Sequence, residues 1–496
     1  MNAPDNTALG ARTMRRLYRD SVALMALAST VEKREGVLRV GAVMATPANL
    51  EILDRSGMKP ADLVAAPDDL LLVVRAVDEA TAQEALDAAE AGLTSTDSGA
   101  PRTERAPQTV LEGLAVGDRP TVAAVSTPGT YAPIVVEQAL REGLHVFCFS
   151  DNVGLDDEVR LKQMAVERRL LLMGPDCGTA VIDRVPLGFA NVLAPGPVAI
   201  VAASGTGAQE IACLLDRAGV GVSQLVGVGG RDLSAAVGGL MTNLALDLVA
   251  EDETTEVVVV VSKPPAEEVA QQLLARLAAL GKPVVACLLG LEDTEAPVVV
   301  RGTLEGGAAA AAEILGRSFE IDEASVATAR DAGTTRGLGS VVGLYTGGTL
   351  AAEAKIILTR AGVAAEILDL GDDQYTAGRP HPMIDPAART EHLVRAGARP
   401  DVGVVLVDLV LGHGASHDPG TPLADAVREA RATAAADGRE LLVLGSVCGT
   451  AADPQGIDGQ RRILRDAGVG LFPSNAAAAR HAAALVNDQR TAQEIA

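Results

Sequence analysis

The 496-residue sequence has no tryptophan, and aromatic residues make up only 2% of it. It also has no long run of Lys or Arg, and its net charge is −23. Nucleic acids and anionic membranes both require a basic surface, so the charge argues against either as a partner. No apolar run is long enough to span a bilayer, and the polar N-terminus has no signal-peptide core. We therefore expect a cytoplasmic protein.

Cysteine and histidine are scarce, which limits the metal chemistry that the chain can perform. The five cysteines are scattered singly with no Cys-x-x-Cys pair, a pattern that favours reduced buried thiols. Cys177 has no histidine near it in the sequence, so a cysteine in a tight turn is favoured over a nucleophile. His413 and His417 are four residues apart, but the neighbouring glycines oppose the helix that a shared metal would need. We predict no metal site.

Small aliphatic residues dominate instead, and short β-branched runs alternate with helical patterns. This alternation predicts βαβ units with parallel sheets, an α/β fold. Polar stretches at 93–108 and 327–340 are typical of linkers. The expected domains are 1–108, 109–195, 196–330 and 338–496. The expected strands are 121–126, 145–150, 170–174, 198–202, 224–228, 256–262, 283–289, 341–345, 365–370, 403–409 and 440–446. The expected helices include 133–142, 156–167, 209–217, 233–249 and 266–280.

Two of these domains look like copies of one fold. The sequence ASGTG at 203–207 follows the first strand of one module, and YTGGT at 345–349 follows the first strand of the next. Gly205 and Gly347 are 142 residues apart in the sequence, and so are Gly229 and Gly371 at the ends of the second strands. A shared offset at two glycine turns predicts an internal duplication, with chance similarity between glycine-rich domains as the alternative.

Each glycine turn has the features of an anion site. A helix that starts directly after a strand presents unpaired backbone N–H groups, and its dipole adds partial positive charge. Glycine allows a ligand close to the backbone, and nearby hydroxyls can cap the helix or donate to oxygen ligands. If the duplicated modules pair, both turns face one anion. The predicted phosphate-binding residues are Ser204, Gly205, Thr206, Gly207, Thr346, Gly347, Gly348 and Thr349.

Further candidates lie at the carboxyl ends of predicted strands, where open α/β sheets bind ligands. The proline-rigid stretch 379–385 offers Arg379, His381 and Asp385 as catalytic candidates, with a structural loop as the equal alternative. Plain helix caps and a surface lysine are the alternatives for the other candidates. The predicted substrate-binding residues are Gly229, Gly230, Arg231, Asp232, Lys263, Asp372, Asp373 and His413.

Several stretches carry a family resemblance. They include YRDSVALM at 18–25, FSDN at 149–152, GPDCGT at 174–179, VGGRDLS at 228–234, SKPP at 262–265, LGDD at 370–373, GRPHPMIDP at 378–386, HDP at 417–419 and VCGT at 447–450. The segment 198–290 resembles the ligase domain of the succinyl-CoA synthetase α subunit, and 343–371 resembles the β-subunit counterpart. The chain as a whole resembles the FdrA family, in which both modules are fused. The resemblance implies a CoA-binding-like Rossmann domain followed by two flavodoxin-like ligase modules of the succinyl-CoA synthetase type.

The sequence departs from succinyl-CoA synthetase in three ways. Histidine is absent between His145 and His381, so the phosphohistidine that follows the α ligase core in that family has no equivalent. The glycine-rich turn for CoA phosphate is missing, because Gly41 precedes its strand, and no P-loop or ATP-grasp domain is visible. An anion site without its histidine can hold phosphate directly while it attacks a carbonyl group.

The FdrA resemblance accordingly implies a subunit of an oxamate carbamoyltransferase. Phosphorolysis of carbamoylated oxamate would give carbamoyl phosphate for a carbamate kinase, in purine and allantoin degradation. Phosphate or an acyl phosphate is the expected ligand, CoA is possible, and no other cofactor is expected. Additional protein subunits and an oligomer are expected. Two alternatives stay open: an ADP-forming acyl-CoA synthetase and a non-catalytic, anion-sensing scaffold subunit.

Overall fold

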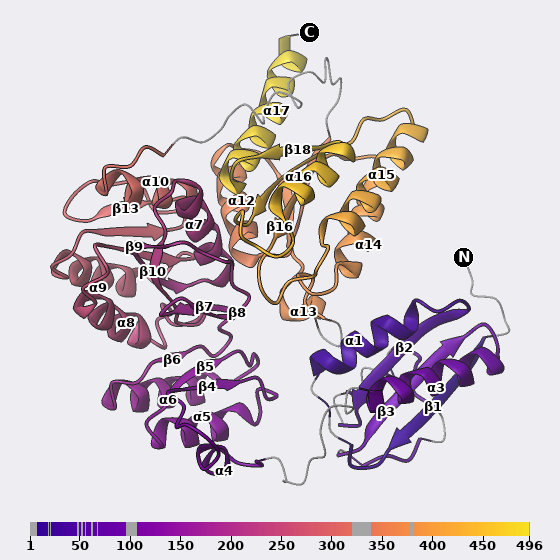
Figure 1. Cartoon of the computed structure of the whole chain (residues 1–496). Helices are drawn as coiled ribbons and strands as arrows, with labels where there is room; N and C mark the ends of the chain where they lie inside the picture. Colours follow the sequence, from indigo (N-terminus) through magenta and orange to yellow (C-terminus); the bar gives the residue numbers. More distant parts are fainter. Residues whose placement is uncertain are drawn as a thin grey trace. The chain divides into compact units, whose positions relative to one another are not determined.

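The computed structural model describes residues 7–319, 339–376 and 380–495, except 18, 20, 47, 48, 51, 52, 55, 61, 62, 67 and 96–106. The chain divides into two compact units. Unit 1 contains residues 1–106 and 373–380, and unit 2 contains 107–372 and 381–496. Figure 1 shows helices and strands in both units, and the three sheets of unit 2 contain parallel strands. The predicted α/β fold class is confirmed.

Unit 1 is built on one antiparallel sheet of order β1-β3-β2. The central strand β3 has the sequence LLLVVRA, and all its residues except Arg75 are buried, because both sheet faces are covered. Leu70, Leu72 and Val74 pack in the core that α1 and α3 share. Leu71 and Val73 pack on the opposite face with Ala45, Leu53 and Met58. The elements are β1 (Ala8–Met14), α1 (Ser21–Glu32), β2 (Val37–Met44), β3 (Leu70–Ala76), α3 (Glu79–Ser95) and the short α13 (Asp373–Thr376).

Unit 2 begins with a small parallel sheet whose strands lie in chain order, β4-β5-β6. Two amphipathic helices, α5 and α6, flank it, and α6 opens with three acidic residues that suit the positive end of the helix dipole. Its elements are α4 (Val110–Leu114), β4 (Val122–Val125), α5 (Ala132–Arg141), β5 (His145–Cys148), α6 (Leu155–Glu167) and β6 (Leu172–Met173).

Module 1 of unit 2 is a seven-stranded sheet of order β13-β12-β11-β9-β10-β7-β8. Side chains of the central strand β9 alternate between two cores, as the pleat requires. Val198, Ile200 and Ala202 face α7, α10 and module 2, and Ala199 and Val201 face α8 and α9. The elements are β7 (Thr179–Ile182), β8 (Val185–Gly188), β9 (Pro195–Ala203), α7 (Gly205–Arg217), β10 (Val222–Gly227), α8 (Leu240–Glu251), β11 (Val257–Ser262), α9 (Glu267–Ala278), β12 (Val284–Leu288), β13 (Val299–Arg301) and α10 (Leu304–Ile314).

Module 2 is a five-stranded parallel sheet of order β15-β14-β16-β17-β18. The face that carries α12 and α17 shares its core with α7 and α10 of module 1, so the two modules form one packed body (Figure 1). The elements are β14 (Ser340–Tyr345), α12 (Gly348–Arg360), β15 (Ala365–Asp369), α14 (Ala387–Ala398), β16 (Val402–Val410), α15 (Gly420–Ala436), β17 (Leu442–Cys448), α16 (Ile457–Asp466), β18 (Val469–Phe472) and α17 (Asn475–Ile495).

Several elements were not predicted from the sequence. The hairpin β7–β8 pairs antiparallel with β10, so the sheet of module 1 starts before the expected boundary at residue 196. The edge strands β13 and β18 were also missed, because each has at most four residues. The helix expected over 233–249 starts only at Leu240, since Gly238 and Gly239 have positive φ angles. The expected linkers lie largely outside the described residues.

Equivalent elements of the two modules support a duplicated architecture. Strands β10-β9-β11-β12-β13 and β15-β14-β16-β17-β18 share the order 2-1-3-4-5 typical of flavodoxin-like sheets. The first helices, α7 and α12, both have 13 residues, with Glu in the sixth position and Arg in the last. These helices start 143 residues apart, so the structural counterpart of Gly205 is Gly348 rather than Gly347.

The paired modules also cap each other's helices. Glu353 of α12 accepts a hydrogen bond from the backbone N–H of Leu304, which starts α10 in module 1. Glu210 of α7 accepts one from the N–H of Asn475, which starts α17 in module 2. Each carboxyl group therefore occupies a helix N-terminus of the other module.

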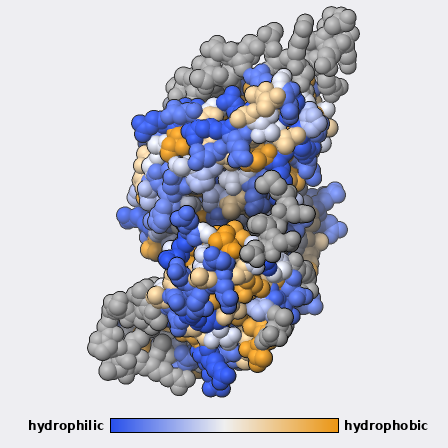
Figure 2. Space-filling model, turned by 90° about the vertical axis from the view of Figure 1, so that its right-hand side faces the viewer, coloured by the Kyte–Doolittle hydropathy of each residue, from blue (hydrophilic) through white to orange (hydrophobic). Residues whose placement is uncertain are grey.

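The face drawn in Figure 2 is mainly hydrophilic. On the face drawn in Figure 2, hydrophobic residues form only a few small patches among polar and charged ones. This distribution agrees with the net charge of −23. Within the described ranges, no helix combines the length and apolar character needed to cross a membrane.

Candidate functional site

The two glycine turns lie at the points where the strand order of each sheet reverses. In module 1, β9 lies between β10 and β11, and the turn after β9 starts α7. In module 2, β14 lies between β15 and β16, and the turn after β14 starts α12. Open α/β sheets bind ligands at such switch points, outside the carboxyl ends of their strands. Both turns are therefore placed where a ligand site is expected.

The two turns contact each other directly. The hydroxyl oxygens of Ser204 and Thr349 are 2.6 Å apart, and the backbone N–H of Thr349 donates to the Thr206 hydroxyl at 3.3 Å. Thr206 and Thr349 have equivalent positions in α7 and α12, so this contact lies on the axis that relates the modules. The helix N-termini converge on one region, as the sequence analysis expected.

Five of the eight predicted phosphate-binding residues are buried and already hydrogen-bonded or tightly packed. In module 1, the Ser204 hydroxyl accepts the N–H of Gly207 at 3.0 Å and thereby caps α7. In module 2, the carboxylate of Asp408 accepts the N–H groups of Thr346 and Gly347 at 2.8 Å each, and the Thr346 hydroxyl at 3.0 Å. Asp408 thus accepts the hydrogen bonds from Thr346 and Gly347 that were predicted to bind phosphate. The five residues are Ser204, Gly207, Thr346, Gly347 and Thr349.

Asp408 is fully buried in β16 and has its own counter-charge. The guanidinium of Arg389 in α14, which is 2% exposed, contacts the Asp408 carboxylate at 3.4 Å and its carbonyl oxygen at 2.6 Å. A buried carboxylate with a buried partner and three donors is electrostatically satisfied. The second turn is therefore held by an internal ion pair.

Three predicted residues keep donors that a ligand can use. Gly205, Thr206 and Gly348 are partly exposed, and no described residue accepts a hydrogen bond from their backbone N–H groups. The ammonium nitrogen of Lys263, at the end of β11, lies 3.2 Å from the point where a Cβ on Gly348 would be. Three free amides and one cation surround the contact between the turns, an arrangement suited to phosphate.

A carboxylate, Asp369, borders the same amide group. It ends β15 and lies against Gly348, and its Oδ1 atom accepts the N–H of Gly371. Burial raises the pKa of Asp369, and the positive charge of Lys263 opposes that rise. Asp369 and Lys263 therefore place a carboxylate and a cation beside Gly348, one of the free amides.

His381 lies beside the second turn. Its Nδ1 atom accepts the N–H of Met383 at 3.2 Å, and its ring centroid is 5.6 Å from that of Phe189. A Cβ on Gly371 would lie 2.5 Å from Nε2 of His381 and 3.0 Å from the carbonyl oxygen of Thr346. Burial lowers the pKa of His381 to about 4, so the imidazole is neutral at neutral pH.

Arg231 and Asp232, which were predicted to bind substrate, are both bound to other groups of the protein. Asp232 is fully buried, and its carboxylate accepts Lys162 at 2.8 Å and the N–H groups of Met241 and Thr242 at the start of α8. Arg231 donates to Val153 and pairs with the buried Glu158. Gly229 and Gly230 precede the pair, and a Cβ on Gly229 would meet the backbone at Pro175. These contacts join the small sheet to module 1.

Two of the remaining candidates, His413 and Asp385, make their described contacts with residues other than the free amides. His413 is exposed, and its backbone pairs with Ala190. Asp385 accepts the N–H of Ala387, the first residue of α14, at 3.0 Å. Asp372 ends the turn after β15, the side chain of Asp373 is not described, and Arg379 lies outside the described residues. Their predicted roles stay predictions.

Sequence reasoning missed Asp408, Arg389, Glu210 and Glu353. Asp408 stands in a buried Val-rich strand, and a charged residue there is a signal of a buried ion pair. Phe189 was missed because the hairpin that ends beside it was missed. The cysteines are buried as expected, and burial raises the pKa of Cys148 to about 11 and of Cys177 to about 12, which disfavours nucleophilic thiolates.

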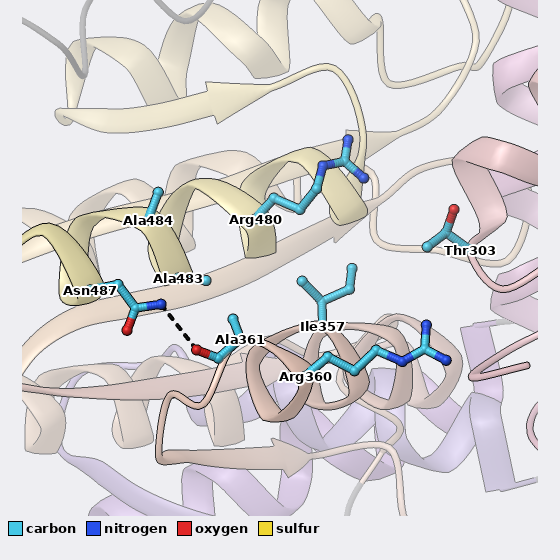
Figure 3. A pocket seen from close by; sticks show the side chains of 8 residues that line it. All are labelled: Thr303, Ile357, Arg360, Ala361, Arg480, Ala483, Ala484 and Asn487. Carbon is cyan, nitrogen blue, oxygen red and sulfur yellow. Dashed lines mark hydrogen bonds between the residues drawn. The ribbon is translucent and has the colours of Figure 1, made fainter. Parts of the chain in front are cut away.

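A shallow cavity of about 460 Å³ lies elsewhere, at the far end of α12 (Figure 3). Arg360 and Arg480 border it, but Arg360 donates to the carbonyl of Gly290, and Arg480 pairs with Glu305. Because α12 has 13 residues, this cavity is about 18 Å from the Gly347 turn. It does not belong to the candidate site.

Two family models match the chain. The model described as "CoA-ligase" matches residues 344–485, and the model described as "AllF, heavy metal-associated domain" matches residues 9–109. The second stretch contains neither cysteine nor histidine, the usual ligands of soft metals. Among the residues that the structure describes, no three His, Cys, Asp or Glu side chains form a possible metal site. The residues of unit 1 do not fit a heavy-metal site.

Known proteins resemble the chain over much of its length. It is 37% identical over 493 residues to the uncharacterized protein YahF of Escherichia coli (strain K12), covering 92% of this chain and 95% of YahF. It is 31% identical over 231 residues to the succinate–CoA ligase [ADP-forming] subunit alpha 1 of Archaeoglobus fulgidus, covering 45% of this chain and 74% of that subunit. The crystal structure of PH0766 from Pyrococcus horikoshii OT3 matches with a TM-score of 0.33 and 18% identity, covering 78% of this chain and 87% of that one.

Proposed function

Because the chain belongs to the family of YahF and the succinate–CoA ligase α subunits, we propose that it transfers an acyl or carbamoyl group to or from phosphate. Phosphate would bind where the two glycine turns meet. The observation that carries the proposal is the set of free N–H groups at Gly205, Thr206 and Gly348, beside Lys263. Inorganic phosphate or the phosphoryl group of an acyl phosphate fits these donors.

In the proposed reaction, a phosphate oxygen attacks the carbonyl carbon of an acyl or carbamoyl donor. The new C–O bond gives an acyl phosphate, and the bond from the carbonyl carbon to the leaving nitrogen breaks. The leaving nitrogen takes the proton that the attacking hydrogen phosphate gives up. With carbamoylated oxamate as donor, the products are carbamoyl phosphate and oxamate. Fixed N–H dipoles and Lys263 stabilise negative charge on the phosphate during the transfer.

The phosphohistidine route of succinyl-CoA synthetase is not part of this proposal. No histidine lies between His145 and His381, and the β12–β13 connection of module 1 has none. Phosphate therefore acts as the nucleophile itself. Additional subunits, an oligomer, a cytoplasmic location and a role in allantoin degradation belong to the same proposal.

The family matches favour a second candidate function, an ADP-forming acyl-CoA synthetase. This function would need a site for CoA. The β4-β5-β6 sheet runs in chain order, so it has no switch point to hold a nucleotide. The turn after β4 is closed as well, since a Cβ on Gly129 would overlap the backbone at Asp151 and Asn152. These residues do not fit the CoA nucleotide, and we assign no step to CoA.

Phosphate binding tests the site directly. We expect inorganic phosphate to bind the full chain in a 31P NMR titration, and Gly205→Val to weaken binding at least about tenfold, because its side chain blocks one amide. Gly113→Val is the matched control, because a Cβ on Gly113 would have no heavy atom within 4 Å and the φ angle of this glycine is ordinary. Equal affinity in both variants would contradict the phosphate site.

The reaction type needs a separate assay. The full chain, co-expressed with its partner subunits, should release oxamate from carbamoylated oxamate only when phosphate is present. CoA-dependent thioester formation would favour the acyl-CoA synthetase instead. Unchanged activity of the partner subunits without this chain would favour the scaffold role.

A further inference from the structure

His381 has one ring nitrogen free for a ligand. The Nδ1 atom accepts the backbone N–H of Met383, so the proton of the neutral imidazole lies on Nε2. No described residue accepts a hydrogen bond from Nε2, although the ring is partly buried. The chain thus fixes the tautomer through one nitrogen and leaves an N–H donor on the other.

Gly371 keeps space open beside this donor. Its φ angle is ordinary, so the glycine is not needed for the backbone conformation. A Cβ at position 371 would lie 2.5 Å from Nε2, closer than real Cβ atoms approach other atoms. The carbonyl oxygen of Thr346, in the second turn, lies 3.0 Å from the same point. The free N–H of His381 therefore lies next to the second turn, close to the backbone amides that we propose bind phosphate.

Three of the chain's scarce aromatic residues form a row that ends beside the imidazole. The chain has only five phenylalanines, and Phe147, Phe149 and Phe189 form a row with centroid distances of 6.4 and 5.6 Å. His381 extends this row at 5.6 Å from Phe189. Phe189 is also linked to the first turn, since its carbonyl accepts the hydroxyl of Thr179, which lies against Gly205. The row connects the imidazole to both turns.

His145 provides an internal comparison. Its Nδ1 atom accepts the backbone N–H of Leu171 at 2.9 Å, and burial lowers its pKa, as for His381. His145 starts β5, however, so it lies at the amino end of a parallel strand, away from the edge where ligands bind. The two histidines share their local bonding and differ in their place in the fold.

From this geometry we propose that His381 donates a hydrogen bond from Nε2 to the carbonyl oxygen of the acyl or carbamoyl group that is transferred. The inference rests on the proposed function, because it needs phosphate at the neighbouring amides. His381 stays neutral throughout and passes on no proton. Its N–H stabilises the negative charge that develops on the carbonyl oxygen when phosphate attacks.

The first test compares two ligands, inorganic phosphate and carbamoyl phosphate, with the full chain. We expect His381→Leu to weaken carbamoyl phosphate binding about tenfold, the effect of one lost hydrogen bond, and to change phosphate binding less than about twofold. His381→Gln should recover part of the loss, because its amide can donate from nearly the same place. His145→Gln should change neither affinity.

Gly371→Ala provides a second test of the position of the imidazole, because the added methyl group displaces the His381 ring without removing it. We expect the same selective loss of carbamoyl phosphate binding as in His381→Leu. NMR of 15N-labelled imidazoles should show the Nε2–H tautomer for His381, and its signal should shift with carbamoyl phosphate more than with phosphate.

The outcomes separate the two proposals. If the wild-type chain binds no phosphate, the proposed function fails, and the inference fails with it. If phosphate binds but His381→Leu weakens both ligands equally or neither, only the inference is overturned. An Nδ1–H tautomer would also overturn it.

Discussion

The two glycine turns have the same fold and different electrostatics. At the first turn, Val261 lies against Gly207, and the neutral hydroxyl of Ser204 caps the helix. At the second, Asp408 lies against Gly347, and its carboxylate takes the N–H groups of the turn. The first turn therefore offers two free amides, and the second offers one beside an internal anion. Duplication created two potential anion sites, and the structure leaves mainly the first of them available to a ligand.

The difference between the turns also argues against one phosphate bound equally by both of them. A phosphate held equally by both helices would need the N–H of Thr349, the counterpart of Thr206, and this N–H already donates to the Thr206 hydroxyl. Direct contact between Thr206 and Thr349 leaves the ligand to bind beside the axis. The second module contributes Gly348 and His381 and braces the first.

The largest effect on stability is expected at the buried ion pair between Asp408 and Arg389, which holds the second turn. Asp408→Asn removes the charge that balances the buried Arg389, and we expect the free energy of unfolding to fall by about 3 kcal/mol. Urea denaturation measures this change. Asp425→Asn in α15 breaks an exposed pair with Arg428 and should cost less than about 0.5 kcal/mol. Similar losses in the two variants would mean that the second turn needs no internal anion.

A smaller effect on stability is expected at Glu353, whose carboxyl group caps α10 of the other module. Burial raises the pKa of Glu353 from 4.5 to about 7, so the native chain keeps a proton that the unfolded chain releases. The resulting stabilisation is complete below about pH 4.5 and is lost as the pH rises towards 7.

Glu353→Gln should remove this pH dependence, because the amide does not titrate. Relative to wild type, the variant should gain on the order of 2 kcal/mol between pH 5 and pH 8 in urea denaturation. Glu429→Gln on α15 is the exposed control. A difference between variant and wild type that is the same at both pH values would show that Glu353 is not a buried acid.

The smallest effect is expected at Lys263, the exposed cation of the first module. Lys263→Met should weaken phosphate binding about fivefold, because an exposed charge contributes at most about 1 kcal/mol, and should leave stability unchanged. The control is Lys355→Met, an exposed lysine further along α12. Equal phosphate affinity in both variants in an NMR titration would exclude Lys263 from the site.

Much of the fold could be predicted from the sequence, because buried parallel strands read as Val-rich runs. The run VVVVVS of β11 and the turns after β9 and β14 are local patterns. Short edge strands such as β13 carry too few residues for a pattern. Besides Gly238 and Gly239, the start of α8 involves Asp232, whose carboxylate accepts a helix N–H and is held by Lys162 from a distant segment.

The site was only partly predictable for a related reason. Glycine, Ser and Thr in a turn reveal that backbone donors exist, but not whether another side chain fills them. Asp408 is some 60 residues from the turn that it caps, and only the fold brings them together. His381 was recognised as a candidate from its rigid loop, whereas its free nitrogen became visible only in the structure.

The central claim is that phosphate binds the free amides of the first turn and Gly348, and not the donors held by Asp408. A crystal structure of the full chain soaked in phosphate tests it most directly. The account predicts a phosphate within hydrogen-bond distance of the N–H groups of Gly205, Thr206 and Gly348, with Asp408 still bound to Thr346 and Gly347. A phosphate that displaces Asp408 from the second turn would contradict it.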